Sequence, residues 1–229
     1  MSVVKKALFR SLPVLSGYIV LGIGFGILLR NAGYGVPWSF AMALFIYAGS
    51  MQYVGVGLIS SGASLLTAAI TTLMVNARHL LYSISMIDRY RDAGIFRPYL
   101  IFSLTDETYS LLCEDSGLEK AENIRYQFFV SFFNHCYWII GCVLGSLLGA
   151  VLPFSAAGIE FSMTALFVTS FTEQWLSGRN HSYAITGLCS TLFCLLLFGP
   201  QYFLIPSMIL ITLILSLLQV RKNRKETLQ

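Results

Sequence analysis

Long apolar stretches follow one another along almost the whole chain, and this succession limits the possible folds more than any other feature. A helix that spans a membrane needs about 20 apolar residues, within a range of about 17 to 25. The sequence therefore predicts an all-α, polytopic transmembrane helix bundle of about seven to eight helical segments. Seven crossings, or six with a re-entrant pair, both fit the pattern. The stretches are residues 12–29, 38–59, 63–86, 99–113, 126–152, 161–176, 183–198 and 202–220.

The composition excludes a soluble domain. Hydrophobic residues make up 56% of the chain and charged residues 11%, whereas soluble domains carry about 25% charged residues. The five cysteines show no metal-binding or redox spacing, so no metal ion or other cofactor is expected. We interpret the whole chain, residues 1–229, as one transmembrane domain.

The distribution of Lys and Arg predicts that both termini are cytoplasmic, because cytoplasmic segments carry an excess of these residues. With eight crossings, the loop that contains Arg89, Arg91 and Arg97 lies outside and fits this rule poorly. If that loop is inside, one of the first three segments does not cross. The other outside cation in this arrangement is Arg30, and the inside ones are Lys5, Lys6, Arg10, Lys120, Arg125, Arg179, Arg221, Lys222, Arg224 and Lys225.

Two segments resemble each other and indicate an internal two-fold repeat. Residues 41–53 read AMALFIYAGSMQY, and residues 163–175 read MTALFVTSFTEQW. The alignment pairs Gln52 with Gln174, and we expect these two residues to face each other across a pseudo-symmetry axis. The spacing leaves open whether the repeat is parallel or inverted.

Glycines spaced four residues apart precede each of these two segments. This spacing lets helices approach closely in lipid, so we expect these glycines to lie at helix–helix contacts. The repeat would then divide the domain into halves of about 12–114 and 125–220. The glycines are Gly22 and Gly26 in the first half and Gly141, Gly145 and Gly149 in the second.

Polar residues interrupt two of the apolar stretches. Asn76, Arg78 and His79 lie inside residues 63–86, where an arginine at mid-helix costs roughly 2.5 to 3.5 kcal/mol on insertion scales. The predicted partner of Arg78 is Asp106 or Glu107 in residues 99–113, because two adjacent carboxylates in a span cannot both ionise cheaply. Alternatively, Arg78 ends a short helix and reaches the lipid headgroups, or the ion pair serves only folding.

Five sequence elements together resemble the AzlC family of branched-chain amino-acid exporters, over about residues 12 to 215. They are GIGFGIL, FAMALFIYAGSMQY, NARHLLYS, LTDETYSLL and GIEFSMTALF. The resemblance implies an inner-membrane permease that expels branched-chain amino acids and, in some members, methionine. It also implies a small hydrophobic partner subunit of the AzlD type, and it assigns no role to individual side chains.

From these observations we expect a transporter driven by the proton-motive force rather than an enzyme. Arg78 would bind the substrate carboxylate or hold a gate carboxylate, and Asp106 or Glu107 would carry the proton. Three further residues would shape the site: Asn76, His79 and Gln52. The alternatives are an intramembrane lipid-modifying enzyme, for which no HExxH or GxSxG motif is present, and a scaffold subunit of a membrane complex.

Overall fold

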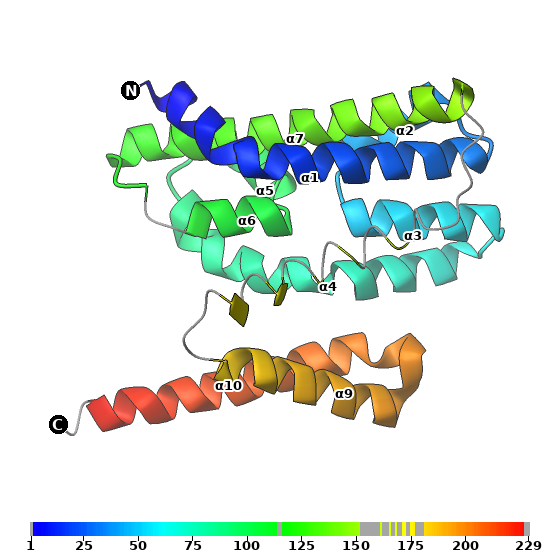
Figure 1. Cartoon of the computed structure of the whole chain (residues 1–229). Helices are drawn as coiled ribbons and strands as arrows, with labels where there is room; N and C mark the ends of the chain where they lie inside the picture. Colours follow the sequence, from blue (N-terminus) through cyan, green and yellow to red (C-terminus); the bar gives the residue numbers. More distant parts are fainter. Residues whose placement is uncertain are drawn as a thin grey trace.

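The computed structural model describes residues 2–113, 116–151 and 181–226, together with seven residues between the last two ranges: 161, 165, 168, 171, 172, 175 and 176. All regular structure in these residues is helical, which confirms the predicted all-α class (Figure 1). The helices are α1 (Val3–Asn31), α2 (Val36–Phe45), α3 (Gly49–Ser60), α4 (Leu65–Tyr90), the 3-10 turn η1 (Gly94–Phe96), α5 (Arg97–Phe102), α6 (Asp106–Cys113), α7 (Lys120–Val151), α9 (Ser182–Tyr202) and α10 (Leu204–Glu226).

Helices α1 and α7 pack against each other and form the frame of the bundle (Figure 1). They run in the same direction, because Gly22 of α1 lies against Gly141 of α7 and Gly26 lies against Gly145. A Cβ atom at Gly22 would come within 2.9 Å of the Gly141 backbone, and one at Gly145 would overlap the backbone of Ile23. The glycines therefore allow backbone-to-backbone contact, as small residues do between helices in lipid.

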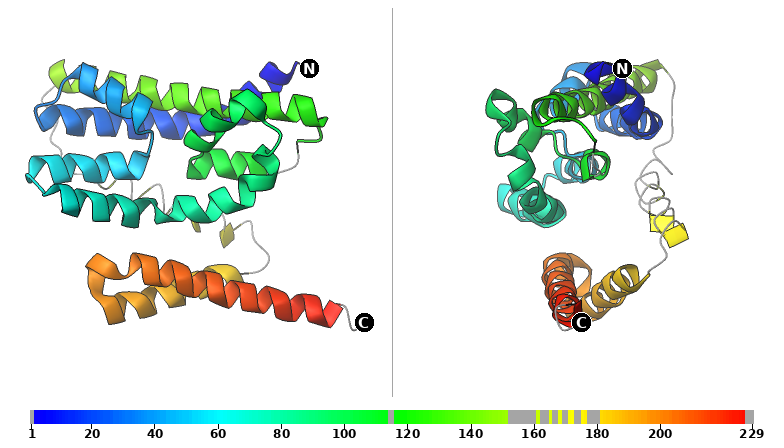
Figure 2. Two further views of the ribbon diagram at one scale, coloured as in Figure 1. Left: turned by 180° about the vertical axis from the view of Figure 1, so that it is seen from behind. Right: turned by 90° about the vertical axis from the view of Figure 1, so that its left-hand side faces the viewer.

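Helices α2 and α3 form a hairpin that enters the bundle from the end where α1 finishes and leaves at that same end (Figure 2). α2 runs back along α7, since Ser39 Oγ donates to the Cys142 carbonyl at 2.8 Å. The chain turns at residues 46–48, and α3 returns beside α1, where Tyr53 OH donates to the Leu21 carbonyl at 2.6 Å. The prediction of one continuous segment over residues 38–59 is therefore wrong.

A second hairpin, η1 and α5 followed by α6, enters from the opposite end, where α4 finishes (Figure 2). Its outgoing arm lies beside α7, with Tyr99 OH 3.1 Å from His135 Nδ1. The chain turns at residues 103–105, and α6 returns to the end it came from, where Arg89 of α4 donates to the Leu112 carbonyl at 2.5 Å. The predicted segment 99–113 is thus also broken. α1 with its hairpin and α4 with its hairpin form two units that run in opposite directions.

Each hairpin returns to the end of the bundle from which it enters, and this places several positively charged segments at the same end. The N-terminus of α1, the turn after α4 and the N-terminus of α7 gather at one end (Figures 1 and 2). There Lys6 Nζ donates to the Ser116 carbonyl at 2.6 Å, and Lys120 forms an ion pair with Asp92. The turn that carries Arg89, Arg91 and Arg97 therefore lies with the N-terminus. In the eight-crossing arrangement this turn lies opposite the N-terminus. The structure places both at one end because residues 38–59 turn back, which fits the alternative that one of the first three segments does not cross.

Helices α9 and α10 form an antiparallel pair, and α10 also contacts α4 (Figure 1). The chain breaks within α9 at Gly199, whose φ of 72° lies in the left-handed region, just before Pro200. Within the described residues, three helices are long and apolar enough to cross a membrane by length and composition: Val3–Asn31, Lys120–Val151 and Ser182–Pro200. α4 spans 26 residues, and its polar run lowers its hydropathy.

Candidate functional site

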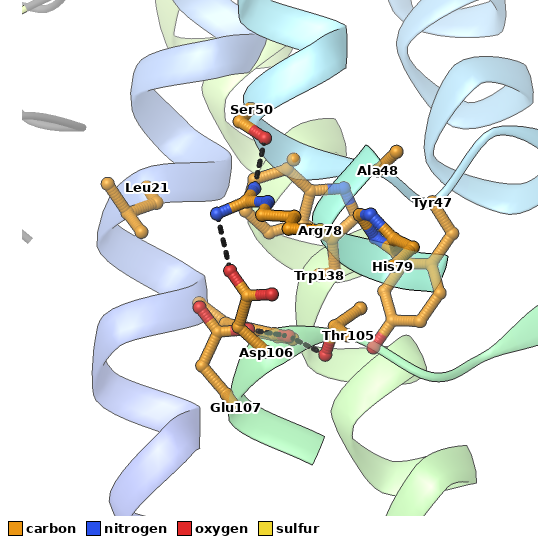
Figure 3. Close-up of a pocket in the computed structure, with 12 residues that line it drawn as sticks. Leu21, Tyr47, Ala48, Ser50, Arg78, His79, Thr105, Asp106, Glu107 and Trp138 are labelled. Carbon is orange, nitrogen blue, oxygen red and sulfur yellow. Dashed lines mark hydrogen bonds and ion pairs between the residues drawn. The ribbon is translucent and has the colours of Figure 1, made fainter. Parts of the chain in front are cut away.

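The tips of the two hairpins meet near the middle of α4 and enclose a small cavity (Figure 3). The cavity has a volume of about 40 Å³, which is enough for a few water molecules or one small polar group. A whole aliphatic side chain needs the tips to separate. The walls come from α1, α4, α7 and both tips: Tyr18, Leu21, Tyr47, Ala48, Gly49, Ser50, Arg78, His79, Thr105, Asp106, Glu107 and Trp138.

The guanidinium of Arg78 joins the two tips (Figure 3). Its Nη1 lies 2.5 Å from Asp106 Oδ2 at the start of α6, and its Nη2 donates to the hydroxyl of Ser50 in α3. The Arg78 and Asp106 side chains are 30% and 34% exposed, so the pair faces a cavity rather than a dry interior. The structure thus contains the ion pair that the sequence suggested, between Arg78 and the first of the two carboxylates.

The second carboxylate has different partners. Glu107 Oε2 accepts a hydrogen bond from Tyr18 OH at 2.7 Å, and the same hydroxyl lies 2.6 Å from Thr105 Oγ1. Thr105 also caps α6, because its Oγ1 accepts from the Thr108 amide at 3.3 Å. The two adjacent carboxylates therefore have separate partners at the cavity: the guanidinium of Arg78 for Asp106 and the hydroxyl of Tyr18 for Glu107.

The tip of the first hairpin has an unusual backbone and an aromatic ring that packs against a histidine. Tyr47 has a φ of 44°, which is uncommon for a residue other than glycine. Its ring lies 4.2 Å, between centroids, from the ring of His135 in α7. His135 in turn places Nε2 3.2 Å from the Ala43 carbonyl and Nδ1 3.1 Å from Tyr99 OH. His135 of α7 therefore contacts both hairpins.

The other predicted site residues are divided between the cavity wall and its surroundings. His79 lines the cavity, whereas Asn76 lies one turn away and is half-buried. Gln52 is 1% exposed and sits behind the wall, where its Oε1 accepts from Trp138 Nε1 at 2.8 Å. Gln52 thus shapes the cavity through Trp138. Gln174 lies outside the described residues, so the predicted Gln52–Gln174 relation stays a prediction.

Several residues of the cavity were not identified from the sequence. Single hydroxyl and indole groups are common in apolar helices and carry little signal by themselves. A usable signal was present at Tyr47-Ala48-Gly49-Ser50, where two small residues and a serine interrupt an aromatic stretch. The residues that were missed include Tyr18, Tyr47, Ser50, Thr105 and Trp138.

Comparison with known proteins gives consistent matches. Residues 13–152 match the family described as AzlC protein. The Bacillus subtilis branched-chain amino acid transport protein AzlC is 38% identical over 222 residues, which cover 97% of this chain and 87% of that protein. A Haemophilus influenzae membrane protein is 42% identical, covering 93% and 88% of the two chains, and the Escherichia coli inner membrane protein YgaZ is 28% identical, covering 77% and 74%. No solved structure matches the chain.

Proposed function

The chain belongs to the AzlC family of membrane proteins, and we propose that it exports branched-chain amino acids such as valine, leucine and isoleucine, and methionine in addition. The name of the Bacillus subtilis relative, a branched-chain amino acid transport protein, supports the substrate class. The name of the Escherichia coli relative supports a location in the inner, or plasma, membrane. The gathering of cations at the end that holds the N-terminus supports cytoplasmic termini.

One observation carries the proposal: two hairpins enter from opposite ends and their tips meet at a polar cavity beside Arg78. Irregular backbone at membrane depth is tolerated where it lines a cavity. Broken helices that meet near the middle of a bundle, in units of opposite direction, are the usual setting of substrate sites in transporters. Covalent chemistry on lipid would need a nucleophile that donates to a general base, whereas the hydroxyl of Ser50 in the cavity wall accepts a hydrogen bond from the guanidinium of Arg78.

The geometry suggests how a proton is coupled to export. Arg78 holds Asp106 as the gate carboxylate, and this contact ties the tip of the second hairpin to α4. Protonation of Asp106 or Glu107 removes one negative charge from the cavity and weakens the attraction that keeps the tips together. The proton-motive force then drives the cycle, because the two sides of the membrane supply protons at different concentrations.

We further propose that the chain is the large subunit of a two-component permease, with a small hydrophobic membrane subunit of the AzlD type as its partner. The test is counterflow of radiolabelled valine, leucine or methionine in proteoliposomes, with and without that subunit. We expect counterflow that is stimulated by the subunit, and accumulation that follows an imposed pH gradient. Purified protein that folds and binds the subunit but exchanges none of these amino acids would contradict the proposal.

A further inference from the structure

A chain of hydrogen bonds leads from Glu107 into the interior of the bundle. The hydroxyl of Tyr18 lies 2.7 Å from Glu107 Oε2 and 2.6 Å from Thr105 Oγ1. Thr105 Oγ1 in turn lies 3.0 Å from Thr108 Oγ1, which accepts a hydrogen bond from Asn134 Nδ2 of α7 at 3.0 Å. Thr108 and Asn134 are both fully buried. The carboxylate is therefore connected to α7 through three hydroxyl groups in succession.

These three hydroxyls can orient their hydrogens in either of two directions. A hydroxyl group donates one hydrogen bond and also accepts, so the hydrogens can all point toward Glu107 or all point away from it. The first arrangement suits an ionised carboxylate, and the second suits a protonated one, which then donates to Tyr18. Conversion of the second into the first moves each hydrogen to the next oxygen. Glu107 loses its proton, every hydroxyl loses one hydrogen and gains one, and one proton leaves from Thr108.

Two further polar side chains extend this line along α7. Gln127, Ser131 and Asn134 lie four and three residues apart, so they share one face of the helix. None is more than 2% exposed, and Gln127 Oε1, Ser131 Oγ and Asn134 Oδ1 have no hydrogen-bond partner among the residues that the structure describes. Buried oxygens of this kind are usually hydrogen-bonded by ordered water. They stand about 4.5 to 6 Å apart along the axis, a gap that one water with two hydrogen bonds of about 2.8 Å can bridge.

The polar line leads toward one end of the bundle. Gln127 lies about two turns from the start of α7 at Lys120, and that start belongs to the end that holds the N-terminus (Figure 2). On the other side of the cavity, α7 contacts α1 through Gly141 and Gly145. Between Ile139 and Val151, all of which the structure describes, Ser146 is the one buried side chain with a polar oxygen or nitrogen. The line therefore connects Glu107 with the N-terminal end.

We propose that Glu107 carries the coupled proton and exchanges it with the end of the bundle that holds the N-terminus, through the three hydroxyls and a file of water along α7. Asp106 stays paired with Arg78 (Figure 3). This assignment rests on the proposed proton-coupled export, and it names the carboxylate and the route. The proton passes from the last hydroxyl to water and ends in the solution at that end, which leaves Glu107 as a carboxylate. The titratable and charged groups that face Glu107 are Tyr18 of α1, Tyr47 of the first hairpin, Arg78, His79 and Tyr82 of α4, and the adjacent Asp106.

The test removes one oxygen from the line. Ser131→Ala leaves the cavity wall unchanged, because Ser131 is not among the described residues that form it. In proteoliposomes that contain a pH-sensitive dye, we expect leucine-coupled proton movement to slow by about tenfold, as for the loss of one hydrogen bond from the route. Leucine counterflow at equal pH on both sides moves no net proton and should stay unchanged.

The matched control is Ser146→Ala, which removes another buried hydroxyl of α7 that has no hydrogen-bond partner in the described part of the chain. Because Ser146 lies on the other side of the cavity, this variant should leave proton movement and counterflow unchanged. Gln127→Leu should act as Ser131→Ala does, and it replaces that variant if the alanine protein does not fold. Glu107→Gln, which removes the titrating group, should abolish leucine-coupled proton movement.

Three results would overturn this assignment. The first is proton movement at the wild-type rate in folded Ser131→Ala or Gln127→Leu protein. The second is counterflow that falls in parallel with proton movement, because that would show a role in packing alone. The third is proton movement that persists in Glu107→Gln. Wild-type protein that exchanges leucine without moving protons would instead contradict the proposed coupling, and wild-type protein that exchanges no amino acid would contradict the proposed function as a whole.

Discussion

The two hairpins have the same shape and opposite chemistry. The α5–α6 tip carries Asp106 and Glu107 and is capped by Thr105. The α2–α3 tip carries no charged residue and leaves its helix end open at Ala48. One tip therefore supplies negative charge, and the other presents the positive end of a helix dipole.

The two hairpins also differ in the contacts that hold them in place. The uncharged hairpin is fixed along its length by α7, through the bonds of Ser39 and Ala43 to Cys142 and His135. The charged hairpin is fixed at its outer end, where Arg89 donates to the last carbonyls of α6. Arg78 contacts both tips, and His135 contacts both hairpins from α7. Loss of Arg78 should therefore affect both hairpins, whereas a change at the outer end of one hairpin should affect that hairpin alone.

The largest effect is expected for Arg78→Gln, which removes the charge that joins the two tips. A close charge pair that loses one partner costs about 2 to 5 kcal/mol, so counterflow should fall by about 100-fold or more. The matched control is Arg89→Gln on the same helix, which loosens only the outer end of α6. It should retain most of the activity. Counterflow of labelled leucine measures both, and an active, well-folded Arg78→Gln protein would show that the two tips do not depend on this residue.

The next largest effect, on thermal stability, is expected at the contact between α1 and α7, the frame on which both hairpins pack. Gly145→Ala places a methyl group into the backbone of Ile23, and overpacking of this kind costs about 1 to 3 kcal/mol. Gly149→Ala, one turn further along α7, meets its nearest atoms at 3.3 Å and should cost less. Thermal denaturation in detergent compares the two variants. Equal stability would mean that α1 and α7 can separate slightly without loss, and that the hairpins do not rely on their close contact.

The helical class and the charged pair could be predicted from the sequence because they depend on local composition. A guanidinium in a span needs a counter-charge, and Asp106-Glu107 is a nearby candidate. The glycines predicted to mediate packing also lie at the α1–α7 contact. The two-fold repeat of halves 12–114 and 125–220 stays a prediction, because most of its second copy, residues 163–175, lies outside the described residues.

The breaks in the hairpins could not be predicted because distant residues stabilise them. Residues Ile46 and Tyr47 are apolar and include no proline, so they look like the middle of a helix. The turn is supported by the ring of His135, 88 residues further along the chain. Similarly, the turn at Thr105 is supported by Tyr18 from α1. Local propensity contains no information on such contacts, and the breaks within residues 38–59 and 99–113 were missed for that reason.

A smaller effect is expected when the charged hairpin loses its cap. Thr105→Val keeps the shape of the side chain but removes the acceptor for the Thr108 amide and one partner of Tyr18. Loss of an N-cap costs about 1 kcal/mol. The control is Ser64→Ala, which uncaps α4 at the end of the bundle and should destabilise the protein without changing leucine affinity. If Thr105→Val and Ser64→Ala alter counterflow equally, the cap of α6 has no role in the cavity.

The smallest effect lies at the outer end of the charged hairpin, where Asp92 pairs with Lys120. The hydrogen bond and charge of Lys120 lower the pKa of the Asp92 carboxyl below its ordinary value. Stabilisation by this pair is therefore present above the carboxyl's unfolded pKa of about 4 and is lost as the pH falls through the lower, folded value. Both groups are exposed, so screening by solvent and salt keeps the effect small. Asp92→Asn should lower the melting temperature slightly at neutral pH, and the difference from the wild type should shrink as the pH falls below that range.

Because the Asp92–Lys120 pair holds the hairpin far from the cavity, leucine affinity should not change. A change in affinity would mean that the outer end of the α5–α6 hairpin controls its tip, which is the behaviour that distinguishes a moving hairpin from a fixed one.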